Sequence, residues 1–301
     1  MKALLVLVLL LLSAAAKAAE PEVIEAEAWY PEGLFWDGET QALYFAEMTA
    51  ERVRRWQDGG LETFIETKSC GPTAIARAGS LFVVACHRGG HLLVLDAEGR
   101  LVERVFESTD GRRLVDPNDL AGDGTGVYVS DSGSFSATAP PTGALLYWRP
   151  GEGLRLLATG LHYANGVLVD AAGRRLLVSE HLARRILAFP ILAPGDIDLP
   201  SVFADIDAVL DLKDPYAGPD GLDLGPEGQV YAAIYGAGRV LAFDASGVAL
   251  GQVALPPAFA TSVAAGPEGQ LFACGAYDNM LSPFLGPVLR FPPDALEPVT
   301  R

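Results

Sequence analysis

The chain has 301 residues, of which half are apolar, 33 are Gly, 21 are Pro and only 3 are Cys. Gly and Pro together stay below the ~25–30% typical of low-complexity chains, and Cys is too scarce for a disulfide-rich scaffold. The 22 basic and 38 acidic residues leave a net charge of −16, which argues against nucleic acid or an anionic membrane as a partner. The same acidic balance suits a protein that holds a cation.

The first 18 residues have the features of a secretory signal peptide. Lys2 precedes an apolar run over residues 3–16, and Ala16-Lys17-Ala18 gives a small-x-small cleavage site. This run is shorter than the ~20 residues that a membrane span requires. We therefore expect cleavage after Ala18 and a periplasmic or secreted protein that has no membrane contact after cleavage. Residues 19–301 then form a single domain.

One pattern recurs from residue 33 onward: an apolar strand, a turn with Gly, an alternating second strand, another turn and a third strand. The residue before each copy marks its phase, and the six markers are Glu32, Thr73, Asn118, Asn165, Asp220 and Thr261. Successive markers are 41 to 55 residues apart, close to the ~40–45 residues of a four-stranded propeller blade. The sequence thus predicts an all-β fold, a six-bladed β-propeller with four-stranded blades around a central channel.

Two further segments bear on this ring. Residues 23–29 alternate in polarity before the first marker, and we expect this strand to complete the last blade, because closure leaves no exposed sheet edge. The longest step between markers contains residues 190–218, rich in Pro and Asp. This insertion is expected to form a long connection or a short helix, either as a lid over one face or as a passive surface feature.

The first strand of each blade lines the channel, so the six markers are expected to surround one of its mouths. Four of them, Glu32, Asn118, Asn165 and Asp220, carry hard oxygen donors with a total charge of −2. Asn or Asp before Gly is also an ordinary turn feature, but turns do not require four such residues at one phase of a repeat. The donor set matches Ca²⁺, with Mg²⁺, Mn²⁺ or Zn²⁺ as other divalent occupants.

The motifs around these markers resemble those of the SMP-30/gluconolactonase/LRE-like family of six-bladed propellers. They are Pro31-Glu32-Gly33-Leu34-Phe35-Trp36, Asn118-Asp119, Ala164-Asn165-Gly166 and Pro219-Asp220-Gly221. The resemblance implies that Glu32, Asn165 and Asp220 bind the divalent cation, that Asn118 binds cation or substrate, and that the reaction is lactone hydrolysis. In the sugar-lactonase branch an Arg commonly stands two positions before the third-blade Asn, where this chain has Asp116.

Within such a site a bound cation holds the lactone carbonyl oxygen while a carboxylate activates water or attacks directly. Asp220 is our first candidate for this catalytic carboxylate and Glu32 the second. A second set of equivalent positions is expected at the same mouth, where the second strands end: Glu47, Cys86, Asp131, Glu180, Ile234 and Gly275. The candidate substrate-binding residues are therefore Asn118, Asp119, Asp131, Glu180, Thr73 and Thr261.

The histidines and cysteines carry weaker signals. The four histidines, His87, His91, His162 and His181, are interpreted as sharing no common phase, which gives no support to a catalytic dyad. His87 or His181 could still reach the pocket, although surface or strand-end positions are favoured for all four. Cys70 and Cys86 both fall near the predicted mouth in one blade and could form a disulfide. Because Cys70, Cys86 and Cys274 are an odd number, at least one stays free or pairs between chains.

The sequence leaves three functions open. The first is a secreted, Ca²⁺-dependent lactonase or esterase with a small-molecule substrate, of undetermined oligomeric state. The second is a non-catalytic propeller that Ca²⁺ stiffens while one face binds a protein or glycan, since the fold alone does not decide function. The third is a paraoxonase-like or phosphotriesterase-like hydrolase, which the same stabilisation of a developing oxyanion permits.

Overall fold

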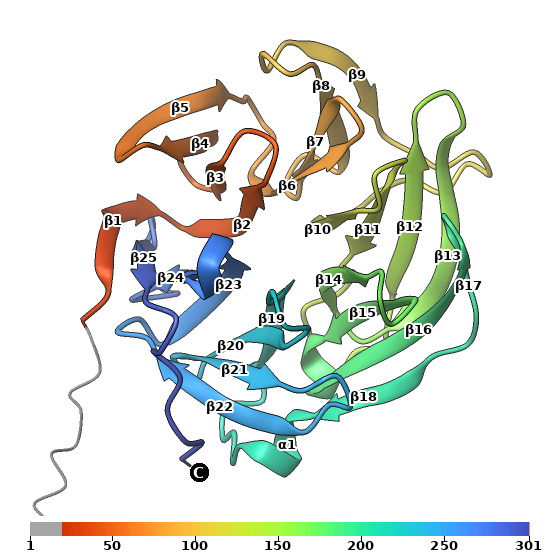
Figure 1. Cartoon of the computed structure of the whole chain (residues 1–301). Coiled ribbons are helices and arrows are strands. Elements are labelled where there is room, and N and C mark those ends of the chain that lie inside the picture. The colour runs from red at the N-terminus through yellow and green to blue at the C-terminus, as the bar shows by residue number, and fades with distance from the viewer. Residues whose placement is uncertain (1–19, 301) are drawn as a thin grey trace, which may run out of the picture.

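The computed structural model describes residues 20–300, so the predicted signal peptide at 1–18 lies outside the described residues. Strand pairing within this range gives six antiparallel blades arranged in a ring (Figure 1). The predicted β-propeller is therefore confirmed. None of the helices in the described part is long and apolar enough to cross a membrane.

Each blade contains four strands in the order in which they pair outward from the channel. Blade 1 contains β2 (Pro31–Asp37), β3 (Ala42–Glu47), β4 (Arg52–Gln57) and β5 (Gly60–Glu66). Blade 2 contains β6 (Pro72–Ala78), β7 (Leu81–Cys86), β8 (His91–Leu95) and β9 (Leu101–Val105). Blade 3 contains β10 (Pro117–Gly122), β11 (Val127–Asp131), β12 (Gly143–Arg149) and β13 (Gly153–Leu161).

The second half of the ring repeats this arrangement. Blade 4 contains β14 (Ala164–Asp170), β15 (Arg175–Glu180), β16 (Arg185–Ala193) and β18 (Ser201–Asp205). Blade 5 contains β19 (Gly218–Leu224), β20 (Val230–Tyr235), β21 (Arg239–Phe243) and β22 (Ala249–Ala254). Blade 6 contains β23 (Phe259–Ala265), β24 (Leu271–Ala276), β25 (Leu285–Phe291) and β1 (Glu22–Trp29). One bridge, Tyr235 with Phe259, joins blades 5 and 6.

The ring is closed by the strand that begins the described chain. β1 pairs antiparallel with β25, for example Val23 with Leu289, and Figure 1 shows the two strands side by side. This confirms the expectation that the segment at 23–29 completes the last blade. The innermost strands β2, β6, β10, β14, β19 and β23 contact one another in order around the channel, so every blade has two neighbours.

The hydrophobic core is divided among the gaps between the blades. Strand β7 shows why: Phe82 and Val84 pack toward blade 1, whereas Val83 and Ala85 pack toward blade 3. Because successive side chains of a strand point to opposite faces, a strand between two neighbouring blades must be apolar at every position. Each pair of adjacent blades in the described part encloses its own apolar cluster.

The predicted insertion at 190–218 divides into two parts. Its first part forms β17 (Asp196–Ile197), which pairs with the end of β16, and then β18, the outermost strand of blade 4. The short helix α1 (Ile206–Val209) follows, and the final stretch carries Tyr216 toward the channel mouth, where its ring meets that of Phe135. Most of the insertion therefore completes the blade, and only its end approaches the mouth. Two 3₁₀ turns, η1 (His181–Ala183) and η2 (Pro267–Gly269), complete the element list.

Candidate functional site

All six markers lie where an inner strand is irregular. Strands β2, β6, β10, β14, β19 and β23 each have a register shift against their second strand at or next to the marker, as between Pro219 and Leu222 around Asp220. A bulge locally bends the strand and redirects a side chain. At each marker the register shift interrupts the regular alternation of side chains along the inner strand. All six interruptions lie at one mouth of the channel.

Four markers with oxygen donors meet there. Glu32, Asn118, Asn165 and Asp220 all line one cavity of ≈ 180 Å³, and Thr73 lines it as well. The remaining lining residues are Tyr30, Met48, His87, Phe135, Tyr163, His181 and Tyr235. The four positions predicted to hold a cation are therefore neighbours in space although they come from four different blades.

The two carboxylates face each other without a basic partner. Burial and then the negative charges of Asp220 and Asp119 raise the pKa of Glu32 well above its usual value. The pKa of Asp220 is raised in the same way by burial and by Asp119. No Lys or Arg in the described chain lines the cavity or forms an ion pair with either carboxylate. Such a pair of buried carboxylates is stabilised by a bound cation.

Asn165 is held by two neighbours. The ring Nε2 of His181 lies 2.9 Å from the carbonyl oxygen of Tyr216, and since a carbonyl only accepts, Nε2 carries the hydrogen. Nδ1 of His181 is then an acceptor for the side-chain amide of Asn165, at 3.4 Å. The Asp220 carboxylate is hydrogen-bonded to the Asn165 side chain as well. With its amide hydrogens used in this way, the Asn165 oxygen is free to bind a ligand in the cavity.

This donor set fits a hard divalent cation. Two carboxylates and two amide oxygens on one small cavity are ligands that Ca²⁺ prefers. Within residues 20–300 no three His, Cys, Asp or Glu side chains come close enough to hold a metal ion together, so a histidine-rich or cysteine-rich zinc centre has no counterpart there.

The two threonine markers link blades. Thr73 donates its hydroxyl hydrogen to the backbone carbonyl of Asn118 at 2.7 Å, and Thr261 donates to the carbonyl of Pro31 at 2.6 Å. Each hydroxyl therefore fastens its own inner strand to that of the next blade. Thr73 still borders the cavity, whereas Thr261 is fully buried and is not part of its lining.

Asp119 faces a different part of the channel. It lines a second cavity of ≈ 220 Å³ together with Asp223, and its carboxylate accepts a hydrogen bond from the Val167 amide at 2.8 Å. Burial raises the pKa of Asp119 to about 7 and that of Asp223 to about 6. Asp119 acts on Glu32 and Asp220 through its charge and does not join them in the first cavity.

The predicted second ring has the expected register. Glu47, Cys86, Asp131, Glu180, Ile234 and Gly275 all pair with the residue that precedes a marker. Asp131, however, accepts hydrogen bonds from the Val115 and Asp116 amides, and Glu180 accepts one from the His162 amide and pairs with Arg185 at 2.5 Å. Neither lines the cavity. Their oxygens are occupied in holding loops, and their role in substrate binding stays a prediction.

His87 and His181 reach the cavity. They also occupy the same position of the blade repeat, contrary to the interpretation that the histidines share no common phase. His87 and His181 each follow directly after a second-ring position, and the equivalent residues Met48 and Tyr235 also line the cavity. All four residues stand one position after a second-ring residue, and this shared position in the sequence would have identified them. His91 and His162 lie elsewhere, as expected.

Another missed set lies two residues before the markers. Tyr30 and Tyr163 occupy these positions, and both adopt a left-handed backbone conformation, with φ of 53° and 64°. Such a conformation costs a side-chain-bearing residue free energy and is concentrated at functional sites. Both rings border the cavity.

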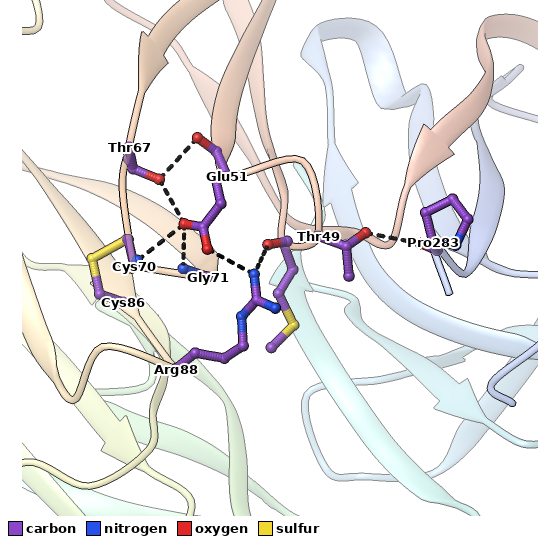
Figure 2. A network of polar contacts seen from close by, with 9 residues as sticks. Thr49, Glu51, Thr67, Cys70, Gly71, Cys86, Arg88 and Pro283 are labelled. Carbon is purple, nitrogen blue, oxygen red and sulfur yellow. Dashed lines mark hydrogen bonds and ion pairs between the residues drawn. A yellow bond between two sulfur atoms is a disulfide. The ribbon is translucent and has the colours of Figure 1, made fainter. Parts of the chain in front are cut away.

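A polar network centred on Glu51 joins Thr67, Cys70, Gly71 and Arg88 (Figure 2). Glu51 and Arg88 are close in sequence to the cavity residues Met48 and His87. The carboxylate of Glu51 accepts hydrogen bonds from the amides of Cys70 and Gly71, at 3.0 and 2.8 Å, and pairs with Arg88 at 2.7 Å. Burial alone would raise the pKa of Glu51, but these partners outweigh it and hold the pKa below its usual value. Arg88 also donates to the carbonyl of Met48 at 3.0 Å.

The disulfide in this network joins Cys70 to Cys86. Cys86 is directly followed by His87, so the bond fixes the backbone at the edge of the cavity. The pairing that the sequence left open is therefore present, and Cys274 is free and buried.

Fold and site together define a six-bladed propeller with an oxygen-donor cluster at one mouth of its channel. Residues 30–273 match the family model for the SMP-30/gluconolactonase/LRE-like region, and the chain belongs to this family.

Known proteins with similar sequences or folds agree with this assignment. Lactonase drp35 of Staphylococcus haemolyticus is 23% identical over 263 residues, which cover 79% of this chain and 76% of the relative. A gluconolactonase structure from Xanthomonas campestris superposes with a TM-score of 0.72 at 22% identity and covers 93% of both chains. The calcium-binding protein regucalcin from Agrobacterium tumefaciens superposes with a TM-score of 0.71 at 17% identity, covering 94% of this chain and 98% of the other.

Proposed function

We propose that the protein is an exported, Ca²⁺-dependent lactonase. The observation that carries the proposal is the meeting of Glu32, Asn118, Asn165 and Asp220 on one cavity without a basic partner. The related drp35 is named a lactonase, and the calcium-binding regucalcin has a similar fold. Export is supported by the signal-peptide features of residues 1–18 and by the Cys70–Cys86 disulfide, which suits an oxidising compartment.

In this proposal the cation supplies, when bound, positive charge that stabilises the negative charge developing on the lactone carbonyl oxygen. Glu32, Asn118, Asn165 and one carboxylate oxygen of Asp220 would hold the cation, which leaves the second Asp220 oxygen off it. Asp220 takes a proton from a water molecule, whose oxygen adds to the carbonyl carbon. The ring C–O bond then breaks, and Asp220 returns its proton to the alcohol oxygen released, which gives the hydroxy acid and regenerates the base. Glu32 is the second candidate for the base.

The test is hydrolysis of a panel of aryl, alkyl and sugar lactones, aryl esters and an organophosphate triester, with Ca²⁺ and with a chelator. We expect turnover that the chelator abolishes and that Asp220→Asn lowers by at least about a hundredfold. The exposed residue Asp294 supplies a control, since Asp294→Asn changes one surface carboxylate far from the cavity lining. Activity that survives both the chelator and Asp220→Asn would contradict the proposal.

Other outcomes of the same panel decide between the remaining functions. Bound Ca²⁺ by calorimetry with no turnover of any lactone or aryl ester would favour a non-catalytic propeller that the cation stiffens. Preferred turnover of an organophosphate triester would favour a phosphotriesterase.

A further inference from the structure

The cavity has a polar part and an apolar wall. Part of its lining carries the four oxygen donors, and another part consists of the large side chains of Tyr30, Met48, Phe135, Tyr163 and Tyr235, which we call the apolar wall. Ring contacts continue this wall from blade to blade. Phe135 lies 4.7 Å from Tyr163 and 5.1 Å from Tyr216 between ring centroids, and Tyr235 lies 5.0 Å from Phe259.

Most polar atoms near this wall already have partners. Both ring nitrogens of His181 are engaged, by Tyr216 and by Asn165. The hydroxyl of Tyr235 accepts a hydrogen bond from Asn279 at 3.2 Å, and the Thr73 hydroxyl donates to the Asn118 carbonyl. The buried Nδ1 of His87, which also lines the cavity, is the exception and has no hydrogen-bond partner among the described residues. A ligand with several hydroxyls would therefore lose more hydrogen bonds to water than this wall returns, which costs binding free energy.

Charge and exposure point the same way. No Lys or Arg in the described chain lines the cavity, and the net charge of −16 repels anions. Outside the cavity the loop between β24 and β25 contacts Tyr235 through the side chain of Asn279. This loop exposes Met280 and Leu281, which are 81% and 72% accessible. The same loop touches the mouth, because the Tyr30 amide donates to the Phe284 carbonyl at 3.1 Å. An apolar surface therefore continues outward from the wall.

We propose that the lactone taken by this site is neutral and hydrophobic, with an aryl or alkyl group that packs against the apolar wall, and is not a polyhydroxylated sugar lactone. This inference rests on the lactonase activity proposed above. It assigns Phe135 as a specificity residue, because its side chain borders the cavity yet is 45% accessible and can be shortened without opening a core.

The experiment compares kcat/KM of the full chain with Ca²⁺ for dihydrocoumarin, for γ-lactones of increasing alkyl length, and for D-glucono-δ-lactone. We expect about a fourfold rise for each methylene that enters the wall, and at least a tenfold preference for dihydrocoumarin over the sugar lactone. Equal or faster turnover of the sugar lactone would overturn the inference.

Variants locate the preference. Phe135→Ala is expected to lower the ratio of kcat/KM for dihydrocoumarin to kcat/KM for γ-butyrolactone about tenfold. The matched control is Phe106→Ala, since Phe106 has a similar accessibility of 42% but stacks on His91 away from the cavity. An equal effect of the two variants on this ratio would contradict the role of the wall.

A binding measurement separates this inference from the proposed activity. If no lactone is hydrolysed, the lactonase proposal fails. Calorimetry with two non-hydrolysed lactams then tests separately whether the cavity prefers a hydrophobic ligand. At least tenfold tighter binding of 3,4-dihydroquinolin-2-one than of glucono-δ-lactam supports a hydrophobic ligand. Tighter or equal binding of the sugar lactam, or binding of neither, overturns it.

Discussion

Nδ1 of His181 accepts a hydrogen bond from the Asn165 side chain at 3.4 Å, and this contact determines which way the amide of a predicted cation ligand points. Burial lowers the pKa of His181 to about 4, so the ring is neutral near pH 7 and Nδ1 retains its lone pair. The carbonyl of Tyr216 keeps the ring in this tautomer. A residue outside the ligand set thus orients a ligand, as is common around metal sites.

Replacing His181 should weaken cation binding. In His181→Phe the ring shape is retained but the acceptor is lost, so the Asn165 amide can rotate its nitrogen into the cavity. We expect the dissociation constant for Ca²⁺, measured by calorimetry, to rise about 10- to 100-fold. His91→Phe is the control, because His91 is also buried but lies beside Phe106. An unchanged affinity in His181→Phe would refute this positioning role.

Cation affinity should increase with pH. The pKa values of Glu32 and Asp220 are both raised in the metal-free protein, so these carboxyls hold protons that the cation must displace. Above the raised pKa values the protons are already gone and no displacement is needed. For each proton displaced, the affinity should rise roughly tenfold per pH unit below the corresponding pKa. Calorimetry in two buffers of different ionisation enthalpy measures the released protons, and no release at any pH from 5 to 8 would contradict the shifts.

The metal-free protein should lose stability as the pH rises through the range in which Asp119 ionises. Its pKa is about 7 in the folded chain against about 3.9 when unfolded. The stabilising contribution of the protonated form is complete below the unfolded value and is lost as the pH passes the folded value. With a chelator present, Asp119→Asn should therefore gain about 2 kcal/mol relative to the wild type between pH 5 and pH 8. Urea unfolding at both pH values checks this difference, and a constant difference would exclude an ionisable Asp119.

Loss of the Cys70–Cys86 bond should destabilise the fold and the cavity wall together. The bond closes a loop with a sequence separation of 16, for which the entropic estimate is about 3 kcal/mol. We expect the variant with both cysteines changed to Ala to unfold at lower urea and to show a raised KM, because His87 and Met48 lose their support. A reductant should reproduce the stability loss in the wild type and have no effect on the variant. Unchanged urea unfolding of the reduced protein would count against a stabilising bond.

The repeats and their marker residues were enough to predict the architecture and to place four oxygen donors at one mouth of the channel. The repeats predicted six blades because a strand buried on both faces must be apolar at nearly every position, and the markers recurred because each blade presents one residue at the same point of the channel. The pairing of residues 23–29 with the last blade followed from the need to close the ring.

Which polar residues remain available to a ligand depends on contacts between blades and loops that the repeats do not specify. Asp131 and Glu180 share the register of the second ring, yet backbone amides and Arg side chains occupy their oxygens. Tyr30 and His181 border the cavity because of a left-handed backbone turn and a hydrogen bond to a distant loop. Periodicity reports where a residue sits in its blade, whereas hydrogen-bond partners come from other blades and loops, and their positions are set only when the ring closes.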